Sequence, residues 1–246
     1  QLISKIELPS SIPHLKEIIE ESDGVMVARG DLGVQLPIEK VPGIQKLIIR
    51  ESNDQGKPVI TATQMLESMI ENPFPTRAEA TDIHNAVMDG TDAIMLSAET
   101  SIGKYPVEAV KNMSKISLEA ETYFDYENYL EEKALKMNFS SVDDAISYNA
   151  CRTSNFINSR AILAFTESGS TAGRVSSFRP KALIIGLIHE QNIEKLLLRW
   201  GVIPVAVPQL KRVQEMFVLG SDISIKTGIS KKNDYVVAVV GMPIGI

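Results

Sequence analysis

The sequence predicts an α/β protein in two parts: half of an eight-stranded (β/α)₈ TIM barrel, followed by a doubly wound α/β domain. Over residues 1–121, short apolar runs alternate with amphipathic stretches, which indicates repeated βα units on a parallel sheet. A second series of strand and helix patterns occupies residues 141–246. Residues 122–140 mix aromatic, acidic and basic side chains without a strand pattern, so we expect them to connect the two domains.

The first part contains four strand-like runs, and each is followed by a stretch with helical character. Four βα units form half of an eight-stranded barrel, and an isolated half leaves two long parallel edges unpaired. We therefore expect the chain to be a portion of a longer protein. The expected strands are LISKIE, GVMVARG, PVITAT and DAIMLSAE, and the expected helices are residues 11–22, 38–51, 64–89 and 106–121.

The second part is predicted to begin with a helix over residues 142–158. Ser141 precedes it as the cap, and Asp144 stands three residues later in capping-box spacing. Residues 242–246 follow the last strand without a cap or a helix, so we expect an incomplete end there. The remaining expected strands are RAILAF, ALIIGL, PVAV and YVVAVVG, and the remaining expected helices are residues 171–178, 193–200 and 210–219.

Composition and charge limit the classes of function. A net charge of −6 argues against a nucleic-acid surface, and the longest apolar runs are too short to cross a membrane. The first residues lack the basic and apolar regions of a secretory signal, and the single Cys151 cannot form an internal disulfide. The expected location is therefore the cytoplasm, and the expected ligands are small molecules.

Charged residues gather where the first two expected strands end. Lys5 and Glu7 share one face of the first strand, and Asp31 follows the second strand on a glycine-flanked turn. Taken alone, the first two are explained by a surface ion pair, and Asp31 by a turn or helix cap. The carboxyl ends of barrel strands, however, are where active sites are built. Two carboxylates there fit Mg²⁺, and the lysine would neutralise a phosphoryl group or an enolate.

Backbone amides and hydroxyl groups at the same edge could bind a substrate carboxylate. The amides of Gly30 and Asp31 could do so if a helical turn begins there. The Thr63 hydroxyl, at the end of the third expected strand, could bind the carboxylate or relay a proton, although threonine is also an ordinary strand former. Ser97 and Glu99 end the fourth strand, where a hydrogen-bonded polar rim explains them equally well.

A loop rich in hydroxyl groups follows the strand RAILAF in the second part. Hydroxyls and free amides at the start of a helix can hold a phosphate. An ordinary βα turn with serine and threonine caps explains the loop equally well, and Glu167 would repel a phosphate. The candidate phosphate-binding residues are Thr166, Ser168, Gly169, Ser170 and Thr171.

These runs closely resemble the corresponding stretch of the pyruvate kinase family. The resemblance covers residues 1–121 and extends more loosely over the C-terminal half. It implies strands 5–8 of the family's catalytic barrel, followed by its C-terminal regulatory, effector-binding domain. The matching runs are SKIE, GVMVARGDLGV, KPVITATQMLESMIENPFPTRAEATDIHNAVMDGTDAIMLSAET and GKYPVEAV.

The resemblance implies an activity and a set of site residues. The family transfers the phosphoryl group of phosphoenolpyruvate to ADP in glycolysis, giving pyruvate and ATP. Lys5 would stabilise the phosphoryl group and the enolate, and Glu7 and Asp31 would bind Mg²⁺ or Mn²⁺. The amides around Arg29 to Asp31 would hold the pyruvate carboxylate, and Thr63 would contact substrate.

The resemblance also implies partners and missing parts. Arg77 in PTRAE resembles an arginine at the subunit interface of the family's homotetramer, although a helix-surface arginine explains it equally well. The hydroxyl-rich loop would bind a sugar-phosphate effector. The family's first four barrel strands, lid domain and K⁺ ligands are not in this chain, so we expect the chain alone to be inactive.

Three other interpretations fit parts of the sequence. Another metal-dependent barrel enzyme that handles phosphoenolpyruvate or a pyruvate enolate, such as an aldolase, fits the first-part chemistry, but TATQMLESM, PTRAEATD and the appended domain argue against it. A non-catalytic effector-binding fragment fits a shortened chain. The adhesion tripeptide RGD at residues 29–31 is too short a match to carry weight.

Overall fold

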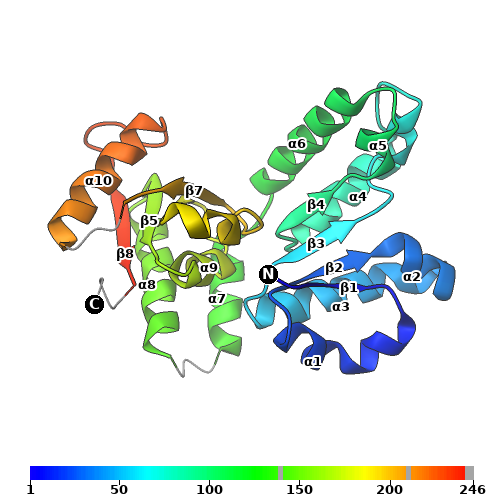
Figure 1. The fold of residues 1–246 in the computed structure, drawn as a ribbon, viewed down its shortest axis with the longest axis horizontal. Coiled ribbons are helices and arrows are strands. Elements are labelled where there is room, and N and C mark those ends of the chain that lie inside the picture. The colour runs from blue at the N-terminus through cyan, green and yellow to red at the C-terminus, as the bar shows by residue number, and fades with distance from the viewer. Residues whose placement is uncertain (138–140, 209–211, 242–246) are drawn as a thin grey trace. The chain divides into compact units, whose positions relative to one another are not determined.

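The computed structural model describes residues 1–137, 141–208 and 212–241, and the chain divides into two compact units, Gln1–Phe124 and Asp125–Ile246. Each unit is built around its own four-stranded parallel sheet (Figure 1).

The segment expected to connect the domains contains a helix. This helix, α7 (Tyr126–Lys136), begins at the side-chain cap of Asp125. Its Leu130 is buried among core residues of the second unit. The last three residues of the expected connection, 138–140, lie outside the described residues. The aromatic and charged mixture of this segment therefore reflects a short amphipathic helix and not an irregular linker.

The first unit has strands in simple sequence order. They are β1 (Ile3–Ile6), β2 (Gly24–Ala28), β3 (Val59–Ala62) and β4 (Ala93–Met95), and every neighbouring pair is parallel. Consecutive parallel strands joined by helices follow the strand order of a (β/α)₈ barrel, as the alternating pattern predicted. Their carboxyl ends all lie at one edge of the sheet.

Side chains alternate across the first sheet, and this alternation positions the candidate site. Ile6 and Val27 are neighbours in register, and both pack into an apolar cluster under the helices. Lys5, one residue earlier than Ile6, therefore points from the opposite face. The covering helices are α1 (Leu15–Glu20) and α3 (Val41–Asp54), seen beside β1 and β2 in Figure 1.

Three of the expected helices begin as 3₁₀ turns. The helix expected over residues 64–89 is a 3₁₀ turn, η3 (Glu67–Ile70), followed by α4 (Arg77–Met88), because Pro73 and Pro75 interrupt it. The other two expected helices, over residues 11–22 and 38–51, likewise begin as the 3₁₀ turns η1 (Pro9–His14) and η2 (Ile38–Lys40).

Two more helices of the first unit follow β4. The short α5 (Ala98–Ser101), which the sequence did not predict, follows β4. The longer α6 (Pro106–Thr122) matches the expected helix over residues 106–121 and packs with η3 and α4. Its buried residues include Ala109 and Met113.

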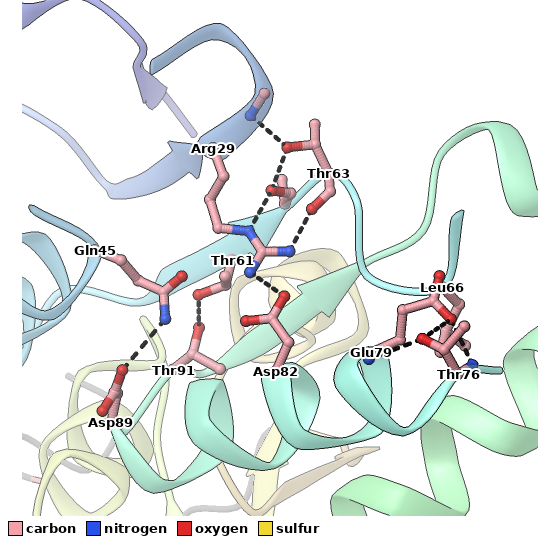
Figure 2. Close-up of polar contacts among 12 residues, drawn as sticks. Arg29, Gln45, Thr61, Thr63, Leu66, Thr76, Glu79, Asp82, Asp89 and Thr91 are labelled. Carbon is pink, nitrogen blue, oxygen red and sulfur yellow. Dashed lines mark hydrogen bonds and ion pairs between the residues drawn. The ribbon is translucent and has the colours of Figure 1, made fainter. Parts of the chain in front are cut away.

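The start of α4 is fixed by a capping box. Thr76 accepts a hydrogen bond from the Glu79 amide, and the Glu79 carboxylate accepts one from the Thr76 amide at 2.7 Å (Figure 2). The same carboxylate accepts hydrogen bonds from the amide and the hydroxyl of Ser68, at 2.7 and 2.6 Å. Glu79 thus joins the η3 turn to the start of α4.

Replacing Glu79 with glutamine is expected to destabilise the intact protein by about 1 kcal/mol at neutral pH, because one of its two acceptor oxygens becomes an NH₂ group that cannot accept the hydrogen bond donated by Ser68 or Thr76. Burial raises the pKa of Glu79, but its hydrogen bonds from Ser68 and Thr76 outweigh burial and lower that pKa below 4.5. This stabilisation is therefore complete above pH 4.5 and is lost as the pH falls through the folded-state pKa. Urea denaturation at pH 7 and pH 4 should show the variant's deficit shrinking on acidification.

The matched control for this prediction is Glu71→Gln, since Glu71 is an exposed partner of Lys104. It should change the denaturation midpoint little at either pH. An acid-independent deficit for Glu79→Gln would contradict the assigned role of its ionised form.

The second unit contains a doubly wound sheet, as predicted. Its strands are β5 (Ala161–Phe165), β6 (Leu183–Ile188), β7 (Val202–Ala206) and β8 (Val236–Val240), paired in parallel in the order β7-β6-β5-β8. The chain thus moves from β5 to β6 and β7 on one side, and then returns to the other side of β5 with β8. This reversal creates a topological switch point at the carboxyl ends of β5 and β8.

Helices cover both faces of this second sheet. Alternate residues of β5 belong to two apolar clusters: Ile162 lies in one with α8 (Val142–Phe156) and α9 (Ser170–Ser177), and Leu163 lies in the other with Met216 of α10 (Val213–Lys226). The helix expected over residues 193–200 is an earlier 3₁₀ helix, η4 (Glu190–Leu196).

Parts of two expectations fall outside the described residues. The first residues of the helix expected over 210–219 do so, and so does the expected incomplete end at 242–246. In the portion of the chain that is described, no helix combines the length and apolar character needed to cross a bilayer.

Candidate active site

Three charged side chains meet where β1 and β2 end. Lys5 belongs to β1, Glu7 follows it, and Asp31 lies in the first turn of α2 (Arg29–Gln35), directly after β2. The Lys5 Nζ lies 2.5 Å from Glu7 Oε2 and 2.7 Å from Asp31 Oδ2. The structure therefore brings together the lysine and the two acids that strand alternation and the glycine-flanked turn predicted at one edge.

Mutual ion pairing fixes the charges in this group. The hydrogen bond to Asp31, and then the one to Glu7, raise the pKa of Lys5 well above its ordinary value. The hydrogen bond from Lys5 likewise lowers the pKa of Asp31. Lys5 is therefore a cation and Asp31 an anion at neutral pH, although both side chains are about half exposed to solvent.

The donor set fits a divalent cation that keeps most of its water. The Lys5 ammonium already bridges Glu7 and Asp31, so the two carboxylates are close enough to share one positive charge. Across residues 1–137, 141–208 and 212–241, no three acidic, histidine or cysteine side chains group as metal ligands. Two carboxylates with room for water and substrate oxygens match the preference of Mg²⁺.

The end of β3 places a hydroxyl beside this group. Thr63 and Gln64 both adopt left-handed backbone conformations, with φ of 70° and 53°. The Thr63 hydroxyl accepts a hydrogen bond from the Gly30 amide at 2.8 Å and donates one to the Ala62 carbonyl at 2.6 Å. The Gly30 amide, expected to hold a substrate carboxylate, therefore donates to Thr63 in this structure.

The Arg29 side chain turns inward from this edge (Figure 2). The residue is 8% exposed, and its guanidinium donates to Asp82 Oδ2 on α4 and to the Thr63 carbonyl, each at 2.5 Å. A longer bond of 3.3 Å reaches the Ala62 carbonyl. Because the Arg29 side chain is buried and bonded in this way, only its backbone amide is left to contact a substrate.

The end of β4 has a structural role. Glu99 is 2% exposed, and its carboxylate accepts hydrogen bonds from the Leu66 amide at 3.1 Å and the Ser97 amide at 2.8 Å. Both of its oxygens are thus used to hold loops in place. This is the hydrogen-bonded polar rim that the sequence left open as one explanation.

The hydroxyl-rich loop of the second unit is closed by its own side chains. The Thr166 hydroxyl accepts a hydrogen bond from the Gly169 amide at 3.0 Å, and Ser168 donates to the Ser170 hydroxyl at 3.1 Å. Gly169 has a φ of 93°, a conformation that glycine adopts without strain. Helix α9 begins at Ser170, one residue before the expected start.

This loop lies at the switch point of the second sheet. It follows β5, and the chain just beyond β8 returns close to it: a Cβ atom at Gly241 would lie only 2.5 Å from Thr171 Oγ1. Open α/β sheets bind ligands at such points, outside the carboxyl ends of the strands. The structure therefore brings the candidate phosphate-binding residues to the location where a ligand is expected.

Two domain families match the chain in the order in which the units occur. The model described as "Pyruvate kinase, barrel domain" matches residues 1–110, and the one described as "Pyruvate kinase, alpha/beta domain" matches residues 144–246. The chain belongs to the pyruvate kinase family. This assignment agrees with the parallel sheet of the first unit and the doubly wound sheet of the second.

Individual pyruvate kinases are similar along the whole chain. Those of Clostridium acetobutylicum and Geobacillus stearothermophilus are each 45% identical over 100% of this chain, but the match covers 52% and 42% of their own lengths. The crystal structure of a pyruvate kinase from Cryptosporidium parvum superimposes with a TM-score of 0.95 at 37% identity, covering 99% of this chain and 50% of that one. The chain thus spans about half the length of these relatives.

One prediction about this pyruvate kinase family chain stays a prediction, and one of its contacts could not be inferred from sequence motifs. Arg77, expected at a subunit interface, is an exposed residue at the first position of α4. The pairing of Asp82 with Arg29 was missed because the two residues lie 53 positions apart. No local pattern distinguishes Asp82 from other acids on the surface of a helix.

Proposed function

We propose that the protein carrying this chain transfers the phosphoryl group of phosphoenolpyruvate to ADP, giving pyruvate and ATP. The observation that carries this proposal is the group formed by Lys5, Glu7 and Asp31 at the carboxyl edge of a parallel sheet. A lysine held beside two carboxylates supplies a fixed positive charge next to a place for a divalent cation. Phosphoryl transfer that leaves an enolate requires both.

Glu7 and Asp31 would hold Mg²⁺ or Mn²⁺, and the family resemblance adds K⁺ through residues outside this chain. The divalent ion would supply positive charge for phosphoryl and enolate oxygens. Lys5, freed from one of its carboxylates, would donate hydrogen bonds to the transferring phosphoryl group and then to the enolate oxygen. The negative charge that develops during the transfer would thus be stabilised by the ammonium of Lys5, which is already in position.

The first turn of α2 and the end of β3 would orient the substrate. The Gly30 and Asp31 amides would bind the carboxylate of phosphoenolpyruvate, with the Gly30 amide exchanging its bond to Thr63 for one to the substrate. The Thr63 hydroxyl would then face the same ligand and could take part in protonating the enolate carbon. Its hydrogen bond with Gly30 supports this arrangement.

The first test is turnover by the intact protein, compared with the 246-residue chain. Pyruvate formation should require phosphoenolpyruvate, ADP and a divalent cation in the intact protein. The isolated chain should form no pyruvate, because the other half of the barrel, which this chain lacks, is needed to complete the site. Condensation of phosphoenolpyruvate or pyruvate with an aldehyde, in place of transfer to ADP, would support the aldolase alternative. Turnover by the chain alone would contradict its expected inactivity.

The second unit supports an additional proposal, the binding of a sugar-phosphate effector. The supporting observation is the position of Thr166 to Thr171 at the β5–β8 switch point. Phosphate oxygens would accept hydrogen bonds from the Ser168, Ser170 and Thr171 hydroxyls and from amides at the start of α9.

Replacing Ser170 with aspartate is expected to abolish effector binding, because a carboxylate at the start of α9 repels a phosphate. In the intact protein, the rise in melting temperature caused by ribose 5-phosphate or glucose 6-phosphate should disappear. Ser221→Asp is the matched control, since Ser221 is exposed on α10 and should leave the rise unchanged. An equal rise in wild type and Ser170→Asp would place the effector elsewhere.

We also propose a homotetramer with Arg77 at a subunit interface, and a location in the cytoplasm. The exposure of Arg77 at the start of α4 supports the first of these. The single cysteine supports the second, since an internal disulfide cannot form. Light scattering of the intact protein and of Arg77→Ala would test the assembly.

A further inference from the structure

One buried cation connects three separate elements beside the candidate site. Arg29 lies at the start of α2, and its guanidinium reaches the end of β3 and the side of α4. The Asp82 side chain that pairs with it is 37% exposed, whereas the Arg29 side chain is 9% exposed. A buried guanidinium needs a charged partner, and Asp82 supplies that partner.

The carbonyl that Arg29 holds belongs to a strained turn. Thr63 and Gln64 both have positive φ, although neither is glycine. Left-handed conformations of this kind are disfavoured and persist only where surrounding contacts enforce them. Arg29 bonds to the Thr63 carbonyl, while the Gly30 amide bonds to the Thr63 hydroxyl. The start of α2 thus forms hydrogen bonds with both the carbonyl and the hydroxyl of Thr63.

We propose that Asp82 is a positioning residue that acts through Arg29 to aim the Thr63 hydroxyl at the substrate. Asp82 balances the guanidinium charge and fixes the plane of the guanidinium fork. The fork in turn holds the Thr63 carbonyl in the left-handed turn. This inference rests on the proposed function, because Thr63 acts on substrate only in that reaction.

The structure distinguishes this role from that of an ion pair that only joins two helices. Asp89, at the end of α4, also makes a long-range ion pair, with Lys46 of α3. Among the residues that the structure describes, the Asp89 carboxylate contacts Lys46 and Gln45 of α3 and reaches no backbone group at the carboxyl edge of the sheet, so we expect this pair to contribute to packing. Removing Asp82 should affect the orientation of Thr63, whereas removing the charge of Asp89 should not.

The test compares Asp82→Ala, Asp82→Asn and Asp89→Asn in the intact protein. Asp82→Ala should lower kcat by about 10- to 100-fold, the effect of a displaced reacting group, with KM for phosphoenolpyruvate changed less than about threefold. Asp82→Asn keeps an acceptor oxygen for Arg29 but not the charge, so its kcat should lie between those of the wild type and Asp82→Ala. Asp89→Asn should lower the melting temperature without lowering kcat.

A double-mutant cycle identifies the route of the effect. In a Thr63→Ala background the hydroxyl is gone, so Asp82→Ala should lower kcat by less than about twofold further. If Asp82→Ala does not fold, Arg29→Lys replaces it in the cycle. Lysine keeps the charge but cannot hold Asp82 and the Thr63 carbonyl together as a fork. Multiplicative losses in the double variant would overturn the proposal.

Hydrogen exchange provides a readout that does not depend on turnover. The Gly30 amide, bonded to the Thr63 hydroxyl, should lose protection in Asp82→Ala and keep it in Asp89→Asn. Unchanged Gly30 protection together with unchanged kcat would overturn the positioning role. Absence of turnover in the wild type would count against the proposed function instead, and the exchange measurement would then decide whether Asp82 holds the turn.

Discussion

Replacing Lys5 with methionine is expected to lower kcat for pyruvate formation by between about 10²- and 10³-fold, the cost of losing one preorganised charge in an active site. Methionine keeps most of the side-chain length but removes the ammonium that bridges Glu7 and Asp31. The affinity for ADP should change little, because Lys5 is proposed to act on the phosphoryl group and the enolate and not on ADP. Steady-state kinetics of the intact protein, with each substrate varied in turn, measures both effects.

Lys104→Met is the matched control for this substitution. Lys104 is also an exposed lysine paired with a carboxylate, that of Glu71, but it lies in the segment between α5 and α6. Its replacement should leave kcat within about twofold, as expected for an exposed ion pair. Equal losses for the two lysine variants would show that charge loss acts through general destabilisation and not through the site.

Replacing Glu7 with glutamine or Asp31 with asparagine is expected to weaken Mn²⁺ binding by at least about tenfold and to lower kcat in parallel. Amide oxygens are neutral and attract a divalent cation less strongly than carboxylates. Electron paramagnetic resonance of free Mn²⁺, titrated with the intact protein without substrate, measures the affinity directly. Glu71→Gln is the matched control and should leave Mn²⁺ binding unchanged.

The two carboxylate variants also test whether one ion is shared. If Glu7 and Asp31 bind the same cation, the double variant should bind Mn²⁺ scarcely more weakly than the worse single variant once binding falls to background. Retention of wild-type affinity by either single variant would remove that residue from the proposed metal site. The kinetic loss would then need another explanation.

The sequence predicted where the candidate site residues lie because their positions depend on rules that act locally. Alternation along a strand puts Lys5 and Glu7 on one face, and parallel pairing puts the turn with Asp31 at the same edge. Thr63 was predicted because it ends the next strand along. These positions follow from strand order alone, and the structure places all four residues at the carboxyl edge.

What could not be predicted depends on contacts between distant segments. Nothing in the local sequence indicates a left-handed conformation for Thr63, since threonine ordinarily favours extended backbone. The inward turn of Arg29 depends on Asp82, which enters the site from α4. Glu99 likewise gained its structural role from the Leu66 amide, 33 positions away.

The predictions of helix boundaries were wrong for a different reason. The apolar residues over 64–89 have helical spacing, but Pro73 and Pro75 interrupt the helix. The 3₁₀ turn before the prolines and the helix after them still pack into the same apolar cluster, so the spacing of apolar residues does not reveal the break. The helix α7 was missed because its apolar face is narrow and lies within a charged segment. Periodicity predicts which residues are buried better than it predicts where a helix begins.

The apolar interiors of the two units are separate. Among the described residues, two clusters lie wholly within residues 1–124 and two wholly within residues 125–241. A core substitution that packs against α9 should therefore not alter the effect of a core substitution that packs against α3. The changes in the free energy of unfolding caused by the two substitutions should add. Descendants of one ancestral gene can thus remodel the interior of the second unit while the interior of the first stays fixed.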